Sequence, residues 1–288
     1  MDSYPFHVSN WPRAISYPHE YNGEERLRLN WDLGVVPEDE KKKIIKAWSD
    51  KLPELGNLRW LSIWSRVTAP VFEAACQLSA LECLELKLSN LTSLEPIQQL
   101  SQLRYLHIGS STKVSSLEPL TALHNLKLLE LENFKQISDF SPLLALKGLD
   151  SLAITGSMWS RQELATLEPF SHMTWLSSLA LDTSSITSLR PLASLIGLKY
   201  LGIGGRLPME EYAWLSAKLP NTECKWFAPY LDLSDSGIGQ CQVCKSDSRV
   251  MLTGRGAKTV CRVCDQAKVA RHEQAFYAAK HASLSAGY

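Results

Sequence analysis

Leucines recur along the middle of the chain in the frame LxxLxxLxL. The frame begins at seven positions whose spacings are 23, 22, 23, 23, 27 and 22 residues: Leu55, Leu78, Leu100, Leu123, Leu146, Met173 and Leu195. A fixed period of this length is typical of solenoids, in which each unit buries its apolar face only against its neighbours. The sequence therefore predicts seven stacked repeats over residues 55–227.

Each repeat carries two local signals. A short LxL, such as Leu84 and Leu86, has the period of two that points alternate side chains of a strand to one face, so these leucines face the core. A proline follows at nearly the same phase in five repeats: Pro96, Pro119, Pro142, Pro169 and Pro191. Because proline fixes φ and lacks an N–H donor, a short turn or 3₁₀ segment is expected on the return side.

Together with return segments such as SLEPI and SLEPL, this pattern resembles the leucine-rich repeats of the short bacterial class found in internalin-like proteins. The resemblance covers roughly residues 53–227 and implies an α/β solenoid, a horseshoe with its strands on the concave face. It departs from the family where the usual asparagine is replaced: Ser89, Ser111, Ser184 and Phe134. A serine hydroxyl can still bond locally, so the fold expectation stands.

Both ends of a solenoid need caps. We expect an N-terminal cap over residues 1–54, in which LRLNWDL alternates as a strand with its apolar residues on one side: Leu27, Leu29, Trp31 and Leu33. A helix begins near Pro37, where acidic residues suit the first turn. Residues 1–20 are expected to pack over this cap. At the other end, we predict a helix between Pro208 and Pro220 and a closing strand over 222–227.

The composition changes from Gly239 onward, where four of the seven cysteines form the pairs CQVC and CRVC: Cys241, Cys244, Cys261 and Cys264. This spacing is typical of a closed structural zinc site, in which four thiolates complete a tetrahedron. Two redox CxxC motifs are the alternative, although no thioredoxin-like βαβ pattern surrounds them. The sequence thus predicts zinc as a structural cofactor, and buried thiols at Cys76, Cys83 and Cys224.

The segment between the two pairs predicts a hairpin that turns at 254–256, and the second pair opens a helix. The module therefore resembles a treble-clef finger, broadly similar to GATA-type fingers. The predicted domain division is an N-terminal cap at 1–54, leucine-rich repeats at 55–227, a linker at 228–238 and a zinc-finger module with a C-terminal helix at 239–288.

Charge is segregated although the whole chain, with 30 basic and 30 acidic residues, is neutral. Residues 239–288 carry eight Lys plus Arg against three Asp plus Glu, whereas residues 1–238 carry 22 against 27. A weakly basic finger can contact phosphates, for example through Arg255 and Arg262. A nucleic-acid-binding regulator that uses the finger is therefore the alternative function.

Side chains between and beside the LxL leucines form the concave side of the sheet, which we call the sheet face. Our predicted partner-binding residues lie on it: Trp60, Trp64, Glu85, Tyr105, His107, Glu130, Glu132, Asp182 and Tyr200. Aromatic anchors and acids suit a protein partner with a basic surface. Two alternatives stay open: an ordinary half-exposed sheet, and binding by the longer loop at 155–164, which holds Met158, Trp159 and Arg161.

No catalytic constellation is present, since the chain has neither HExxH nor GxSxG, and GRGAK is too short for a phosphate loop. No stretch approaches the roughly 20 apolar residues that span a bilayer, and the N-terminus lacks the pattern of a signal peptide. We expect a non-enzymatic, cytoplasmic, bacterial-type protein that binds another protein and no membrane. An immunity or antitoxin protein covering a basic toxin, or an adaptor, fits this expectation.

Overall fold

The computed structural model describes residues 10–32, 36–157, 160–183 and 185–285. By its contacts the chain divides into two compact units: Met1–Pro169 with Asp182–Ser185, and Phe170–Leu181 with Ile186–Tyr288. We call them unit 1 and unit 2 and describe each by itself.

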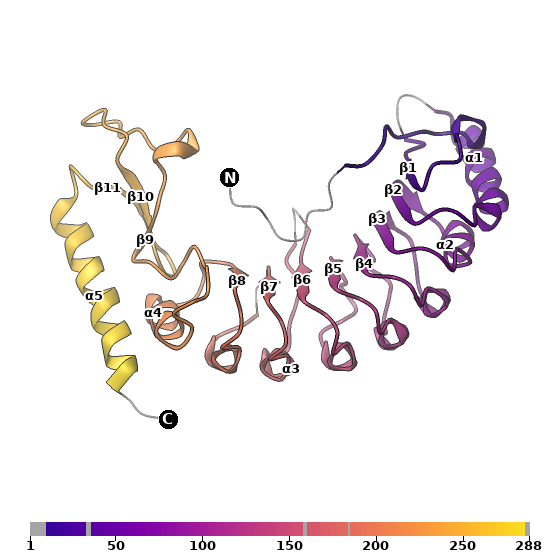
Figure 1. The fold of residues 1–288 in the computed structure, drawn as a ribbon. Coiled ribbons are helices and arrows are strands. Elements are labelled where there is room, and N and C mark those ends of the chain that lie inside the picture. The colour runs from indigo at the N-terminus through magenta and orange to yellow at the C-terminus, as the bar shows by residue number, and fades with distance from the viewer. Residues whose placement is uncertain (1–9, 33–35, 158–159, 184, 286–288) are drawn as a thin grey trace. The chain divides into compact units, whose positions relative to one another are not determined.

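One parallel sheet carries the repeats (Figure 1), and its strands follow one another in chain order. Unit 1 holds six strands: β1 (Arg26–Leu29), β2 (Trp60–Val67), β3 (Cys83–Ser89), β4 (Tyr105–Ile108), β5 (Leu128–Glu132) and β6 (Ser151–Thr155). Unit 2 holds β7 (Ser178–Leu181) and β8 (Tyr200–Ile203). The registers align the repeat leucines, as in Leu84 opposite Leu106 and Leu106 opposite Leu129. The predicted α/β solenoid of leucine-rich repeats is confirmed.

The prolines begin short helices on the return side of the repeats, as predicted. Four of these helices are 3₁₀ and have proline in their first turn: η3 (Glu95–Gln99), η4 (Glu118–Ala122), η5 (Ser141–Ala145) and η6 (Arg190–Ser194). Two return segments are α-helical instead, namely α2 (Ala69–Ala75) and α3 (Glu168–Ser171). Leucines and isoleucines on both sides are buried between strands and helices, and this apolar layer is the core.

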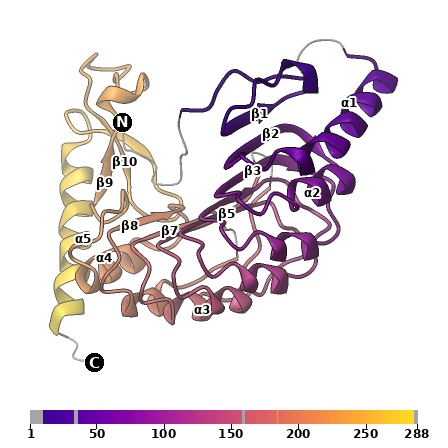
Figure 2. The ribbon, with the colours of Figure 1, turned by 45° about the vertical axis from the view of Figure 1, so that its right-hand side comes forward.

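The N-terminal end is closed by β1, which pairs in parallel with β2, and by α1 (Glu38–Lys51). Helix α1 lies alongside α2, as Figure 2 shows, and two short 3₁₀ helices flank this region: η1 (Pro18–Glu20) and η2 (Leu52–Glu54). Ile15 bridges Leu29, and the indole of the wholly buried Trp48 donates to the Ser16 carbonyl at 2.7 Å. The described residues before β1 therefore pack on this end, while Leu33 lies outside the described residues.

The missing repeat asparagines are replaced in two ways. Ser89 and Ser111 bond each other through buried hydroxyls 2.5 Å apart, and Ser184 lies outside the described residues. At the wholly buried Phe134, the amide of Gln162 substitutes for the asparagine. Its oxygen accepts the Phe134 N–H at 2.9 Å, and its nitrogen donates to the carbonyls of Phe134 (3.0 Å) and Ile137 (2.8 Å). The long loop thus supplies the hydrogen bonds that the repeat lacks.

Gln162→Leu is expected to lower the free energy of unfolding of unit 1 by about 2–4 kcal/mol, because the buried Phe134 N–H and the Ile137 carbonyl lose this partner, while the Phe134 carbonyl keeps the Ile137 N–H at 3.0 Å. Urea denaturation of the purified variant measures this loss. Gln102→Leu, at an exposed position on the return side, is the matched control and should stay within about 0.5 kcal/mol of the natural chain. Equal stability of the two variants would contradict the inference that Gln162 replaces the missing repeat asparagine.

The C-terminal end contains one confirmed element and one error of prediction. Helix α4 (Met209–Lys218) lies between Pro208 and Pro220 as expected. The closing strand over 222–227 is wrong, because only Glu223 bridges β8 before the chain turns. The turn brings in Trp226, which is 7% exposed and donates its indole N–H to the Ile203 carbonyl at 2.8 Å. Burying that indole replaces continued strand pairing.

A second sheet follows in unit 2, with the antiparallel order β11–β10–β9. Its strands are β9 (Tyr230–Asp232), β10 (Arg249–Leu252) and β11 (Thr259–Cys261), with η7 (Ser234–Ser236) after β9 and α5 (Gln266–Ser285) after β11. The predicted hairpin is confirmed, and its turn uses Gly254 with φ +116°. A Cβ at Gly254 would lie 2.9 Å from the Met209 nitrogen, so only glycine fits there.

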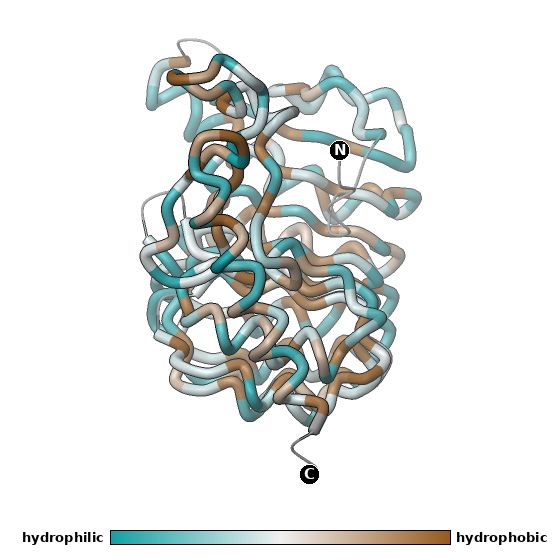
Figure 3. Tube along the Cα trace, turned by 90° about the vertical axis from the view of Figure 1, so that its left-hand side faces the viewer, coloured by the Kyte–Doolittle hydropathy of each residue, from teal (hydrophilic) through white to brown (hydrophobic). Residues whose placement is uncertain are grey.

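Helix α5 packs along α4 within unit 2 (Figures 1 and 2). Its buried residues, Val269, Phe276 and Ser283, are seven apart and form one stripe, as expected for a helix that contacts a partner along one face. Figure 3 shows hydrophobic and hydrophilic stretches alternating along the chain.

None of the described helices is both long and apolar enough to cross a membrane.

Candidate functional sites

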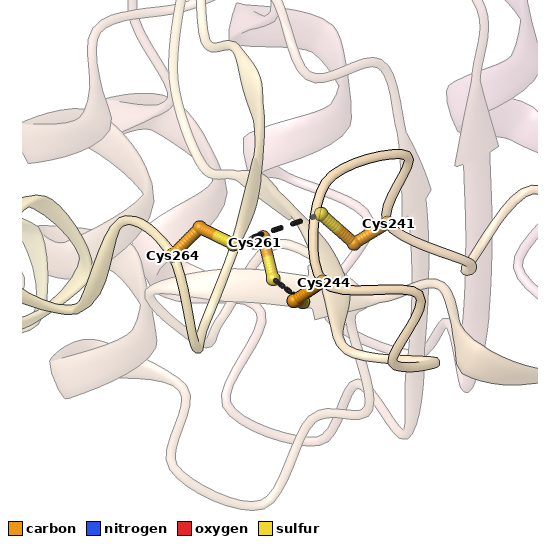
Figure 4. A group of neighbouring side chains, drawn as sticks. All are labelled: Cys241, Cys244, Cys261 and Cys264. Carbon is orange, nitrogen blue, oxygen red and sulfur yellow. Dashed lines mark hydrogen bonds between the residues drawn. The ribbon is translucent and has the colours of Figure 1, made fainter.

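The two CxxC pairs meet in unit 2. Cys241 and Cys244 lie on a tight turn closed by the Lys245 N–H on the Cys241 carbonyl at 3.0 Å, whereas Cys261 ends β11 and Cys264 directly precedes α5. All four Sγ atoms lie within 4.8 Å of one another. Figure 4 shows the side chains converging, with Sγ–Sγ distances of 3.9 Å for Cys241–Cys264 and 3.6 Å for Cys244–Cys261.

These distances fit a tetrahedral metal ion. Zinc–sulfur bonds of about 2.3 Å at tetrahedral angles place the sulfurs about 3.8 Å apart, close to the values seen here. A hydrogen bond from the Ser246 hydroxyl, 2.9 Å from Cys244 Sγ, lowers the pKa of Cys244 to about 6. The four cysteines can therefore bind one metal ion. In contrast, Cys76 and Cys83 are buried, as predicted, and burial raises the pKa of both thiols, while Cys224 is half-buried.

The cysteine module contacts the repeats of unit 2 through its hairpin as well as through α5. The Arg255 N–H donates to the Leu207 carbonyl at 2.8 Å, and within the module Thr253 bonds the carbonyls of Ala228 (2.6 Å) and Pro229 (2.9 Å). Its own apolar core is small: Val250, Leu252, Val260 and Val269, with Tyr230 packed against them. The segment 228–238 takes part in this module, since β9 pairs with β10.

Three arginines of the module make contacts within the chain. Arg255 Nε donates to the Arg206 carbonyl at 3.0 Å, and Arg249 donates to the Ile238 carbonyl at 2.8 Å. Arg262 forms an ion pair with Asp232 at 3.0 Å. These guanidinium groups are therefore used in holding the module together.

The sheet face of unit 1 encloses a cavity of about 320 Å³, which we call the sheet-face cavity. Its lining consists of acids, rings, cations and the strand residues beneath them: Trp11, Arg28, Trp64, Cys83, Leu84, Glu85, Lys87, Tyr105, Leu106, His107, Leu128, Glu130 and Glu132. Six of the predicted partner-binding residues are brought together here: Trp64, Glu85, Tyr105, His107, Glu130 and Glu132.

The other three predicted residues lie elsewhere or are covered. Trp60 is half-buried, with Tyr105 5.8 Å and Trp11 6.0 Å from its ring centre and the Arg26 guanidinium 4.2 Å above it. Asp182 forms an ion pair with Arg161 of the long loop at 3.0 Å. Tyr200 lies on β8 of unit 2. Met158 and Trp159 of the loop lie outside the described residues.

Two of the cavity residues that were not among the predicted ones, Trp11 and Arg28, come from outside the repeats. The Arg28 guanidinium lies 4.6 Å from the Trp64 ring centre and 5.6 Å from that of Trp11, and Lys87 lies 5.1 Å from Trp64. The signal for Arg28 was present, because it alternates with Leu27 and Leu29 and so belongs to the sheet face. Trp11 lies in a segment without a period, so no local pattern places it.

His107 lies at the centre of the acidic part of the cavity. Its Nε2 is 3.8 Å from Glu132 Oε2, which is too long for a hydrogen bond and becomes an ion pair when the imidazole is protonated. Burial alone would lower the pKa of His107. The Glu132 carboxylate and the charges of Glu130 and Glu85 outweigh burial, however, and raise this pKa above its ordinary value.

No protein-family model matches the chain, and no curated protein matches it. Among solved structures, an internalin from Listeria monocytogenes is 20% identical over 59% of this chain and 54% of its own, with a TM-score of 0.44. Internalin C2 of the same species is 22% identical over 60% and 71%, with a TM-score of 0.46. A leucine-rich-repeat protein of Leptospira interrogans is 18% identical over 74% and 57%, with a TM-score of 0.48. The chain thus spans about half of the first of these, and its fold class rests on its own strand order and registers.

Proposed function

We propose that the chain is a non-enzymatic protein-binding module whose sheet face binds a protein partner with a basic surface. The observation that carries this proposal is the sheet-face cavity, which joins Glu85, Glu130 and Glu132 to the rings of Trp64 and Tyr105. Aromatic residues in concave, partly dry surroundings are the usual anchors of protein interfaces, and charge of one sign selects and steers the partner.

In this proposal the four-cysteine module has a structural role and does not bind the partner. It holds zinc, and its turn, hairpin and helix make it a treble-clef finger. Four thiolates leave no open coordination position, so the metal supplies folding energy rather than a reactive water. The alternative, a nucleic-acid-binding regulator, is less well supported, because Arg249, Arg255 and Arg262 are bonded within the chain.

We propose a cytoplasmic, bacterial immunity or antitoxin protein, or an adaptor, which covers a basic protein surface. The predicted division into a cap, repeats, a linker and a finger stays a proposal, in which the segment 228–238 joins the repeats to the finger and also pairs with it through β9.

Photo-crosslinking from the sheet face tests the function. A benzoylphenylalanine in place of Lys87, which lines the cavity and is exposed, is expected to crosslink one protein with a basic surface in extracts of the native cell. The same probe in place of Gln99, which is exposed on η3 of the return side, should not crosslink that protein. Mass spectrometry identifies the crosslinked species and its charge.

Crosslinks to a single protein from Gln99 only would move the interface away from the sheet face. Crosslinks to nucleic acid that disappear when Arg255 and Arg262 are both replaced by glutamine would favour the alternative. An acidic partner at Lys87 would contradict the charge argument.

A further inference from the structure

Unpartnered buried polar atoms gather at the sheet-face cavity. Three residues of its lining each have a buried nitrogen without a hydrogen-bond partner among the described residues: Trp11 Nε1, Arg28 Nε and His107 Nε2. Buried polar groups in proteins are nearly always paired with protein, water or a ligand. Trp11 Nε1 and Arg28 Nε are N–H donors and need an acceptor, whereas Nε2 of a neutral His107 that carries its proton on Nδ1 is an acceptor available to a donor from outside.

A fourth such atom, the hydroxyl oxygen of Ser62, lies on β2 of the same sheet. The registers place Arg28, Ser62, Glu85, His107 and Glu130 in one row across β1 to β5. Ser62 is 0% exposed, and its hydroxyl has no partner among the described residues. Three of the four unpartnered atoms, those of Arg28, Ser62 and His107, therefore lie in one row of the sheet, and Trp11 lies outside this row.

The charges along this row are unevenly placed. Arg28 and Lys87 both lie on the ring of Trp64, towards the β1 edge. Glu130 and Glu132 come from β5, three strands from Trp64 on β2, and flank His107. The end of the cavity near β5 is therefore acidic and attracts a cation, although the complete lining is close to neutral.

We propose that the acidic end of the sheet-face cavity receives one arginine side chain of the protein partner. A guanidinium group has five N–H donors in a rigid plane, which match several acceptors at once: the carboxylates of Glu130 and Glu132 and the Nε2 of neutral His107. The Tyr105 ring also lines the cavity, and aromatic rings attract guanidinium groups. The volume of about 320 Å³ is roughly ten times the 30 Å³ of one water molecule, enough for such a side chain.

His107 makes this site depend on pH. The protonated imidazole is itself a cation among Glu85, Glu130 and Glu132, and its Nε2 has no lone pair to accept a hydrogen bond. The cations Arg28 and Lys87 lie on the Trp64 ring. Since these acids raise the pKa of His107, the proton must leave before the guanidinium binds well. Affinity is therefore expected to increase as the pH rises through this raised pKa.

Calorimetric titration of the full chain with Nα-acetyl-arginine amide tests the proposal. A ligand of this size is expected to bind with a Kd of about 1 mM. The citrulline analogue, which has nearly the same shape but no charge, should bind at least 10-fold more weakly. Affinity for the arginine probe should increase several-fold as the pH rises from about 6 to about 9, because the ordinary histidine pKa is about 6.5 and that of His107 lies above it.

Variants locate the site. Glu130→Gln with Glu132→Gln, two nearly isosteric changes at half-buried positions, should weaken the arginine probe at least 10-fold. Glu118→Gln, an exposed acid on η4, is the matched control and should leave binding unchanged. Equal binding of arginine and citrulline, full binding by the double variant, or affinity that falls with rising pH would each overturn the proposal.

The inference rests on the proposed function, and the two fail in different ways. If the Lys87 probe captures a basic protein while the arginine amide does not bind, the sheet face remains the interface and the arginine site is wrong. If the arginine amide binds while no protein is captured, the cavity is a small-molecule site and the proposed function is wrong.

Discussion

Cys261→Ser is expected to abolish zinc binding and to unfold the four-cysteine module. Coordination by four thiolates contributes folding free energy of the order of 10 kcal/mol, far more than any single side-chain contact. The module cannot replace that energy, because its apolar cluster among the described residues is small: Val250, Leu252, Val260 and Val269. Elemental analysis should find one zinc ion per natural chain and none in the variant.

Hydrogen exchange shows how far the unfolding spreads. Protection should be lost over residues 239–285 and should decrease in α4, since α5 packs along it and the Arg255 N–H bonds the Leu207 carbonyl. Unit 1 should keep its protection, because each repeat contacts chiefly its neighbours. Cys224→Ser, a half-buried thiol outside the cluster, should keep its zinc. Metal-free natural protein with a fully protected module would contradict the structural role.

Much of the fold could be predicted because the residues that determine it recur with a regular period. An apolar residue that must face the core recurs every 22 or 23 residues in all steps but one, and a proline limits the return segment to one short turn. The error at 222–227 has a different cause. There, one indole finds a buried carbonyl at Ile203, and this long-range contact outweighs the strand pattern. Gln162 was missed for the same reason, since nothing in its own loop indicates that it pairs with Phe134.

In the candidate sites, too, residues set by a local pattern could be predicted, and residues placed by long-range contacts could not. The cysteine cluster was predictable because two short spacings determine a metal site, and the sheet-face acids because alternation along a strand determines a face. Alternation does not show which of these residues are already bonded, as Asp182 is to Arg161. It also does not place Trp11, whose position depends on the path of a segment without a period. What a local pattern cannot predict here is contact between distant segments.

Phe276→Ala is expected to lower the free energy of unfolding of unit 2 by about 3–5 kcal/mol, the usual cost of removing a buried phenylalanine ring. Phe276 is 0% exposed and lies at the middle of the α5 stripe between Val269 and Ser283, so its loss leaves a cavity where α5 packs. Denaturant dependence of hydrogen exchange in α4 and α5 measures the change. The variant should still bind zinc, because the ring contributes no ligand and lies well beyond Cys264 on the helix.

This variant separates two ways in which the C-terminal module can serve the repeats. If the module only folds beside them, Phe276→Ala should affect α5 alone; if it caps them, as the α4–α5 packing indicates, protection should fall in both helices together. Leu284→Ala, at a position 61% exposed on the same helix, is the matched control and should change stability by less than about 0.5 kcal/mol. Loss of protection in α5 with α4 unchanged would show that the repeats of unit 2 need no cap from this helix.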